Sequence, residues 1–255
     1  MRTASAYNDF IDSLARVVEA RDDTLGLVLL GSSADRERAD EWSDHDFFLV
    51  TTDGAQERYR TDLSWLPDAA HLALSVRETH HGLKVLYDNG HVLEFAVFSF
   101  DELLLAQTNA WAAAVDKGGV AQRMAEIAAR PKPHPDPAAA LGIFVSLLLI
   151  GVGRARRGET LAAGQSVRTH AVGHLLAALT QSLTSDEAHR LDSLDPFRRF
   201  EQVYPELAAG IARALEREVE SAARELLDLA ESQFGDTEMW PARGVVAVRE
   251  RLGWR

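Results

Sequence analysis

Hydrophobic and polar positions follow two different patterns along the chain, and the pattern changes near residue 117. Before that point, short apolar runs separated by turn residues predict strands. Apolar positions three and four residues apart predict helices over residues 7–20 and 56–63. The predicted strands span residues 25–30, 46–52, 71–77, 83–87, 91–98 and 111–115.

The second half of the chain shows a helical pattern. Interleaved prolines over residues 130–137 cannot continue a helix, so this segment is expected to be an extended connector. Helices are predicted over residues 137–156, 161–183 and 205–231, and the last carries an apolar stripe suited to a bundle. These patterns predict an α+β protein, with a mixed-sheet domain at residues 1–117 and an α-helical bundle domain at residues 118–255.

Residues 138–153 form an uncharged and strongly apolar stretch. It is shorter than the roughly 20 residues that a membrane span needs, so a buried core helix is expected and no membrane partner. The first eight residues lack the apolar segment of a signal peptide, which favours a cytoplasmic protein. The absence of cysteine excludes disulfides, thiolate metal sites and cysteine nucleophiles.

The 255-residue chain is acidic, with 27 Lys+Arg against 39 Asp+Glu and a net charge of −12. Binding to long stretches of DNA or RNA needs a basic surface, so no nucleic-acid partner is expected. The charge instead favours small molecules, and cationic ones in particular. The sequence carries no signal for an oligomeric state.

Two polar segments at strand ends carry the candidate chemistry. Gly31-Ser32-Ser33 follows the first predicted strand, where a glycine lets the backbone approach a phosphate and serine hydroxyls donate hydrogen bonds to it. Ser43 and then Asp44 and Asp46 open the next strand. Because side chains alternate along a strand, the two aspartates project from the same face and can share a divalent cation.

A third acid, Glu94, lies in the middle of the predicted strand over residues 91–98. A carboxylate there is costly unless it binds a metal, lies at a cleft edge, or pairs with a cation such as Lys84 or Arg77. Taken singly, these signals are ordinary, because Gly-Ser pairs and Asp-x-Asp triplets commonly mark turns and helix N-termini. Their order along the chain is more specific.

That order resembles the nucleotidyltransferase superfamily to which DNA polymerase β belongs, and within it the chain looks like the bacterial aminoglycoside and lincosamide adenylyltransferases. The resemblance covers about residues 25–98 and rests on the segments LLGSS (29–33), WSDHDF (42–47) and YDNGHVLEF (87–95). Two features depart from the family. The third acid is a glutamate where several relatives have aspartate, and the helical half has no lysine assignable to phosphate binding.

The resemblance implies an enzyme, a Mg²⁺-dependent transferase of the adenylyltransferase kind, with its catalytic domain at residues 1–117. Its partners would be ATP, or another nucleoside triphosphate, and a hydroxyl-bearing small molecule such as an aminoglycoside- or lincosamide-like antibiotic. Asp44, Asp46 and Glu94 would be the catalytic and metal-binding residues. The implied cofactor-binding residues are Gly31, Ser32, Ser33 and Ser43.

The general base stays open between Glu94 and Glu159, which follows a glycine in the helical half. Three arginines, Arg154, Arg156 and Arg157, either complement the end of a helix or contact the polyphosphate. His170 and His174 have the spacing of a zinc-binding helix, but the glutamate of that motif is missing, so core histidines are expected.

Two alternatives to small-molecule transfer stay open. Related minimal nucleotidyltransferases paired with toxins adenylylate protein side chains, so the acceptor could be a protein. The fold could also be catalytically silent and bind a nucleotide or a partner, although intact Asp44, Asp46 and Glu94 argue against this.

Overall fold

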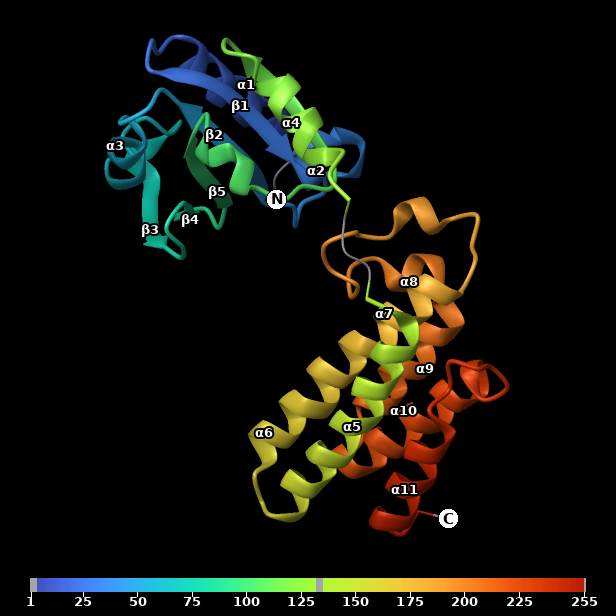
Figure 1. Cartoon of the computed structure of the whole chain (residues 1–255). Coiled ribbons are helices and arrows are strands. Elements are labelled where there is room, and N and C mark those ends of the chain that lie inside the picture. Colours follow the sequence, from blue (N-terminus) through green and yellow to red (C-terminus); the bar gives the residue numbers. More distant parts are fainter. Residues whose placement is uncertain (1–3, 132–134, 255) are drawn as a thin grey trace. The chain divides into compact units, whose positions relative to one another are not determined.

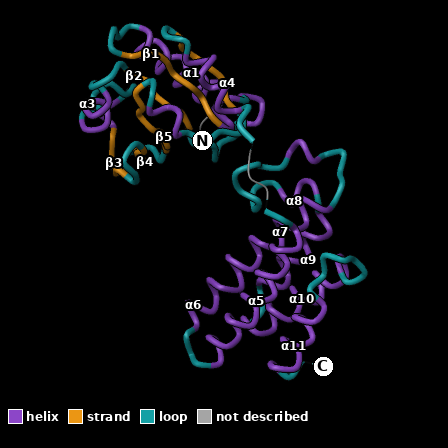
Figure 2. The backbone as a smooth tube through the Cα atoms, viewed as in Figure 1, coloured by secondary structure: helices purple, strands orange, loops and turns teal. Residues whose placement is uncertain are grey.

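The computed structural model describes residues 4–131 and 135–254, and it divides the chain into two compact units, residues 1–131 and 132–255 (Figure 1). All described strands lie in the first unit, and the second consists of helices and their connections (Figure 2). The predicted α+β class, a mixed sheet followed by an α-helical bundle, is confirmed. Residues 132–134 of the predicted extended connector lie outside the described residues.

The first unit is built on one six-stranded sheet in the order β3-β4-β5-β2-β1-β6. β2 (His45–Thr51) and β5 (Val92–Ser99) are parallel neighbours, whereas the other pairings are antiparallel. The remaining strands are β1 (Thr24–Leu30), β3 (Leu72–Arg77), β4 (Gly82–Tyr87) and β6 (Trp111–Asp116). Each strand matches a predicted apolar run to within one residue at each end.

Helices cover both faces of this sheet. α1 (Ala4–Glu19) and α3 (Gln56–Thr61) pack on one face, and α4 (Val120–Ala128) packs on the other. Side chains alternate between the two faces of β1. Leu27 and Leu29 therefore pack on the α1 side, and Val28 packs on the α4 side. A single helical turn, α2 (Gly31–Ala34), continues β1 directly.

α4 explains where the first unit ends. The sequence placed the domain boundary at residue 117, because the strand pattern stops there. In the structure α4 follows β6 and buries Val120, Met124 and Ile127 against the sheet. This helix therefore belongs to the first unit, and the units divide at residues 131 and 132.

The second unit is a helical bundle around α5 (Pro137–Arg156), which contacts α6, α7, α10 and α11. α5 begins with Pro137 in its first turn, and the Asp136 side chain accepts hydrogen bonds from the amides of Ala138 and Ala139. The other helices are α6 (Thr160–Gly164), α7 (Val172–Ser182), α8 (Phe200–Val203), α9 (Pro205–Leu215), α10 (Val219–Phe234) and α11 (Ala242–Leu252).

The prediction of one helix over residues 205–231 is wrong, because the chain turns between α9 and α10. Glu218 is extended there, with φ −55° and ψ 149°. The two helices fold back on each other so closely that a Cβ on Gly210 would lie 2.9 Å from Leu229. The guanidinium of Arg168 also donates to the carbonyl of Arg217 in the turn. One apolar stripe thus serves two shorter helices.

Among the described residues, α5 is the one helix long and apolar enough to cross a membrane by length and composition. In the structure Leu141, Phe144, Leu148 and Val152 are fully buried in the bundle. α5 is thus a core helix of the second unit, as its length predicted. The predicted helix over residues 161–183 is interrupted by a π-helical stretch, Gln165–Ala171, between α6 and α7.

Candidate metal and nucleotide site

Two parallel strands bring the three predicted acids together. Asp46 of β2 lies opposite Glu94 of β5, and paired positions of neighbouring strands project from the same face. Asp44 stands just before β2. The three acids each offer one ligand oxygen, and these atoms all lie within 4.8 Å of one another. The structure therefore gathers into one group, here called the acid group, the three residues that the sequence singled out.

The acid group suits a hard divalent cation. Mg²⁺ prefers oxygen ligands at about 2.1 Å, so two oxygens on one ion lie about 3–4 Å apart. The observed oxygens lie within 4.8 Å of one another. Asp46 and Glu94 are moreover like charges at facing positions of the sheet, which is destabilising. A bound cation would offset this repulsion.

A lysine lies at the rim of the acid group. Lys84 faces Glu94 in the β4–β5 register, with its Nζ 3.6 Å from Glu94 Oε2 and 3.0 Å from Glu78 Oε1. These contacts, with Glu78 the stronger, raise the pKa of Lys84. Arg77 pairs with Glu57 instead of Glu94. The Glu94 side chain is still 50% exposed, so it has a sheet partner and remains accessible to a ligand.

Gly31 joins β1 to α2 in a conformation that favours glycine. Its φ is +52°, in the left-handed region, and a Cβ there would lie 3.4 Å from Asp46 Oδ2. Its N–H donates to the carbonyl of Ala110 at 3.0 Å. A larger residue would be strained and would crowd the acid. The glycine therefore lets the backbone pass close to the acid group.

The two serines that follow Gly31 have different surroundings. Ser33 is fully buried, and its hydroxyl bonds to Tyr7 and to the amide of Asp46. This corrects the expectation that the Ser33 hydroxyl holds a phosphate. Ser32 is partly exposed, and both backbone amides lie in the first turn of α2, where N–H groups lack an intrahelical acceptor. Phosphate contacts would therefore come from the Ser32 hydroxyl and these amides.

Arg38 is a candidate that the sequence analysis missed. Its guanidinium donates to the Asp35 carboxylate at 2.6 Å and to the carbonyl of Gly31 at 3.1 Å. The contact places a positive charge beside the glycine turn, where an anionic phosphate would lie. In the same segment, the predicted Ser43 hydroxyl forms a turn with Asp40, accepting from its amide at 3.0 Å. Ser43 therefore shapes the segment rather than facing the acids.

Buried aromatic side chains pack on the core side of β2, behind the acid group. His45, between the two aspartates, points into the core, where its ring stacks on Tyr7 with centroids 3.8 Å apart. Its Nδ1 is 2.6 Å from Nε2 of His91. Burial raises the pKa of Tyr7, and the charges of Asp46 and Asp44 raise it further, although bonds to serine hydroxyls oppose this. Tyr7 therefore stays a neutral phenol beneath the acids.

In the second unit, three of the predicted charged residues, Arg156, Arg157 and Glu159, have partners within that unit. Arg156 binds Glu220 and the carbonyl of Leu252, so it joins α5 to α10 and α11. Arg157 lies 2.7 Å from Glu159, and this arginine holds the pKa of Glu159 below its usual value. These contacts favour the structural interpretation of the two arginines.

The predicted histidine pair does not form a metal site with other residues. His170 is exposed on the π-helical stretch, and His174 is partly buried on α7. Burial lowers the pKa of His174. Within residues 4–131 and 135–254, neither belongs to a group of three potential metal ligands.

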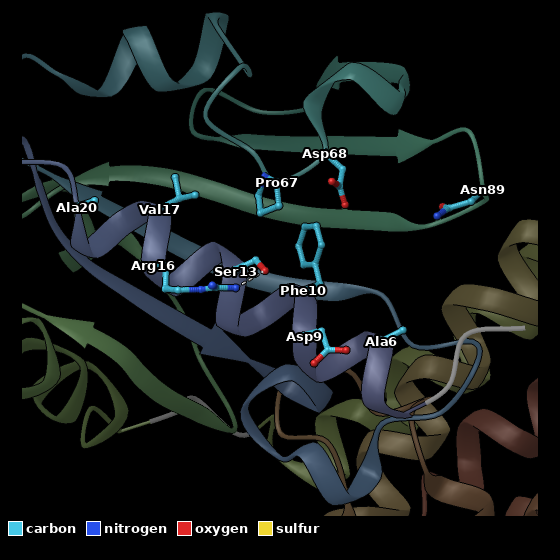
Figure 3. Close-up of a pocket in the computed structure, with 10 residues that line it drawn as sticks. All are labelled: Ala6, Asp9, Phe10, Ser13, Arg16, Val17, Ala20, Pro67, Asp68 and Asn89. Carbon is cyan, nitrogen blue, oxygen red and sulfur yellow. Dashed lines mark hydrogen bonds between the residues drawn. The ribbon is translucent and has the colours of Figure 1, made fainter.

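A groove of about 770 Å³ lies along α1 (Figure 3). Figure 3 shows Phe10 and Arg16 of α1 on one side and Pro67, Asp68 and Asn89 on the other. Its described lining residues do not include the acid group. Phe10 links the two regions only indirectly, because its ring also contacts His45 and His91.

No protein-family model matches the chain, and no curated protein matches it. Solved structures give remote similarities. An aminoglycoside 6-adenyltransferase from Bacillus subtilis is 11% identical with a TM-score of 0.33, covering 100% of this chain and 93% of that one. A nucleotidyltransferase-like protein from Exiguobacterium sibiricum 255-15 is 14% identical with a TM-score of 0.32, covering 90% and 75%. A chain of the E. coli MS115-1 CdnC:HORMA-deltaN complex is 12% identical with a TM-score of 0.29, covering 89% and 92%.

Proposed function

We propose that this protein is a nucleotidyltransferase that moves a nucleoside monophosphate, AMP from ATP in the first instance, to a hydroxyl of a small molecule. The observation that carries the proposal is the acid group, whose ligand oxygens lie within 4.8 Å of one another beside the Gly31 turn. Carboxylates close to a backbone turn suit a metal-bound triphosphate. The activity is inferred from this site and not from the remote structural similarities.

Asp44, Asp46 and Glu94 would hold Mg²⁺. When bound, the cation supplies positive charge that stabilises the charge growing on the phosphates during transfer. The Ser32 hydroxyl and the first-turn amides of α2 would orient the phosphates, because both lie at the same strand end as the acids. Arg38 would add a fixed cation there, which its contact with the Gly31 carbonyl supports.

Glu94 is also the better candidate for the general base. It lies in the acid group with half of its side chain exposed, so an acceptor hydroxyl can reach a carboxylate oxygen and transfer its proton there. Glu159 is paired with Arg157, which lowers its pKa and makes it a weaker base. The net charge of −12 favours a cationic acceptor such as an aminoglycoside.

One observation favours the catalytically silent alternative. Lys84 pairs with Glu94, so the sheet already provides this acid with a cation. The lysine also binds Glu78 more closely, at 3.0 Å, which would let it stay in place when Glu94 turns toward a metal. A transferase and a catalytically silent nucleotide-binding protein therefore differ in whether divalent metal changes the binding of nucleotide.

The test is metal-dependent turnover, measured as pyrophosphate release from ATP with a panel of hydroxyl-bearing acceptors. We expect Asp44→Asn and Asp46→Asn each to lower turnover by roughly 10³-fold or more, because the metal contributes several kcal/mol to the transition state. Their folds should be kept, since the change relieves repulsion among the acids. EDTA should abolish both turnover and the thermal stabilisation given by ATP. Wild-type turnover in either variant would refute the proposal.

A further inference from the structure

We infer that Tyr7 is a positioning residue for Asp44 and Asp46, which it holds through a chain of hydrogen bonds shared with Ser33. The inference rests on the proposed function in one respect, because it takes the acid group to be a metal site. Tyr7 lies in the first turns of α1, far from the acids in sequence. Its hydroxyl bonds directly to the backbone before His45 and, through Ser33, reaches the backbone after it.

The hydrogen bonds run in one direction. The Tyr7 hydroxyl donates to the carbonyl of Asp44 at 2.8 Å. That bond uses its only hydrogen, so in its 2.9 Å contact with Ser33 Oγ the serine must be the donor. Ser33 Oγ in turn accepts from the amide of Asp46 at 3.1 Å. Each hydroxyl thus donates once and accepts once between the two aspartates, an arrangement in which the bonds strengthen one another.

This chain adds to the support that the sheet gives. Asp46 pairs with Glu94 of β5, and the β1–β2 ladder on the other side of β2 reaches the pair Leu29–Phe47. Asp44 precedes β2 altogether. Ser33 supplies the acceptor for the Asp46 amide, and Tyr7 supplies the donor for the Asp44 carbonyl. The backbone that carries both carboxylates is therefore fixed by two side chains from other elements.

Tyr7 also fixes the residue between the aspartates. Its ring stacks on the ring of His45 at an interplanar angle of 16°. Its backbone carbonyl lies 3.1 Å from His45 Nε2, and a carbonyl only accepts, so that nitrogen carries the proton. Nδ1 of His45 contacts Nε2 of His91 at 2.6 Å. With His45 held inward, the side chains before and after it point to the other face.

The Tyr7–Ser33 contact is shielded from water, because Ser33 is 0% exposed and Tyr7 is 3% exposed, whereas the bonds to Asp44 and Asp46 are part-buried. Removing the phenol hydroxyl therefore leaves the Asp44 carbonyl without its donor and lets the Asp44 backbone shift. Outer partners that orient metal ligands typically contribute about 10–100-fold to metal affinity or activity. The Tyr7 hydroxyl is expected to fall in this range.

The experiment compares Tyr7→Phe and Ser33→Ala with the control Tyr59→Phe. Tyr59 belongs to the same hydrophobic cluster and is equally buried, but its hydroxyl donates to Asp23, beyond the other end of α1. The readouts are the Mn²⁺ dissociation constant of the nucleotide-free protein, the melting temperature, and amide hydrogen exchange at Asp46 by NMR. None of these requires turnover.

We expect Tyr7→Phe and Ser33→Ala each to weaken Mn²⁺ binding about 10–100-fold and to speed exchange of the Asp46 amide. Tyr59→Phe should lower the melting temperature to a similar extent yet leave Mn²⁺ binding within about threefold of wild type. The double variant should bind Mn²⁺ within about threefold of the weaker single variant, because both changes break one chain.

Two results would count against the inference in different ways. If wild type binds Mn²⁺ and Tyr7→Phe binds it equally well, the tyrosine is merely structural and the inference is overturned, while the proposed function stands. If wild type binds no Mn²⁺, the proposed function fails and the positioning role fails with it.

Discussion

Among the described residues, two groups of potential metal ligands lie in the first unit, and they differ in the cation beside them. In the acid group, Asp44 and Asp46 lie at the start of β2 and Glu94 lies on β5, and Lys84 contacts Glu94. The second group consists of His80, His81 and Glu102, whose ligand atoms are equally close, within 4.8 Å. By residue type and distance alone, both would pass as metal sites.

The second group is occupied by the protein's own cation. Arg60 is buried, with 4% of its side chain exposed, and its guanidinium donates to Glu102 Oε2 at 3.0 Å. The same nitrogen lies 2.9 Å from His81 Nδ1, which must accept because arginine has only donors. A further pair of bonds ties the guanidinium to the carbonyl of Val97. The arginine therefore binds two of the three potential ligands, His81 and Glu102.

The comparison shows that ligand type and spacing do not by themselves define a metal site. A buried arginine needs a carboxylate, so Glu102 stabilises the fold at the second group. In the acid group the like charges of Asp46 and Glu94 face each other across the sheet, a cost that a bound cation would offset. The two groups therefore differ in their protein cation: Lys84 contacts Glu94 from the neighbouring strand and is 43% exposed, whereas Arg60 is buried against Glu102.

The largest expected effect in this comparison concerns Glu94. If it is the general base, Glu94→Gln should lose roughly 10²–10⁴ in turnover and keep the affinity for Mg-ATP, because Asp44 and Asp46 still hold the cation. If it is mainly a ligand, nucleotide affinity should weaken together with the rate. Steady-state turnover and ATP titration of the same variant separate these cases.

Glu159→Gln is the matched control for this prediction. Its carboxylate is paired with Arg157, so the variant should keep turnover close to wild type. Normal turnover in Glu94→Gln together with a collapse in Glu159→Gln would place the base in the helical unit.

The positions of the strands and the shared face of the two aspartates could be predicted from the sequence for a physical reason. Short apolar runs and alternation are local properties, so all six strands and the shared face of Asp44 and Asp46 could be read from neighbouring residues. The convergence of Glu94 on this pair needs the β2–β5 register, which the sequence pattern does not fix. That expectation came from the family resemblance.

The supporting residues could not be predicted in this way. Tyr7 and Ser33 are separated by 26 residues, and Arg60 and Glu102 by 42, so their contacts depend on tertiary structure. In the sequence, Tyr7 is one apolar position on an amphipathic helix, and its hydroxyl gives no local signal. The helix break at residues 216–218 was missed for the same reason, since one stripe fits either one long helix or two that pack together.

A smaller effect, on stability rather than turnover, is expected for Glu102. Glu102→Gln removes the carboxylate that faces the buried Arg60, and it should lower the free energy of unfolding by about 1–3 kcal/mol. Because this group is structural, Mn²⁺ binding and turnover at low temperature should match wild type. Urea unfolding and Mn²⁺ titration measure the two quantities. Loss of Mn²⁺ binding with unchanged stability would reverse the roles given to the two groups.

The smallest expected effect is a pH dependence of stability that comes from His81. Burial, with a contribution from Arg60, lowers the pKa of His81 below its usual value of 6.5, although Glu102 opposes this. As the pH falls below about 6.5, the unfolded chain therefore binds a proton before the folded protein does, and the free energy of unfolding decreases. The loss ends once the pH is below the pKa of the folded state. For one proton the slope cannot exceed about 1.4 kcal/mol per pH unit. Glu102, whose pKa is lowered by the Ser99 amide and Arg60 against the effect of burial, affects stability only at more acidic pH, below its usual 4.5.

Urea unfolding of wild type and His81→Gln between pH 7.5 and about 5.5 should therefore show a shallower decline in the variant. Equal slopes would mean that burial and Arg60 do not lower the pKa of His81.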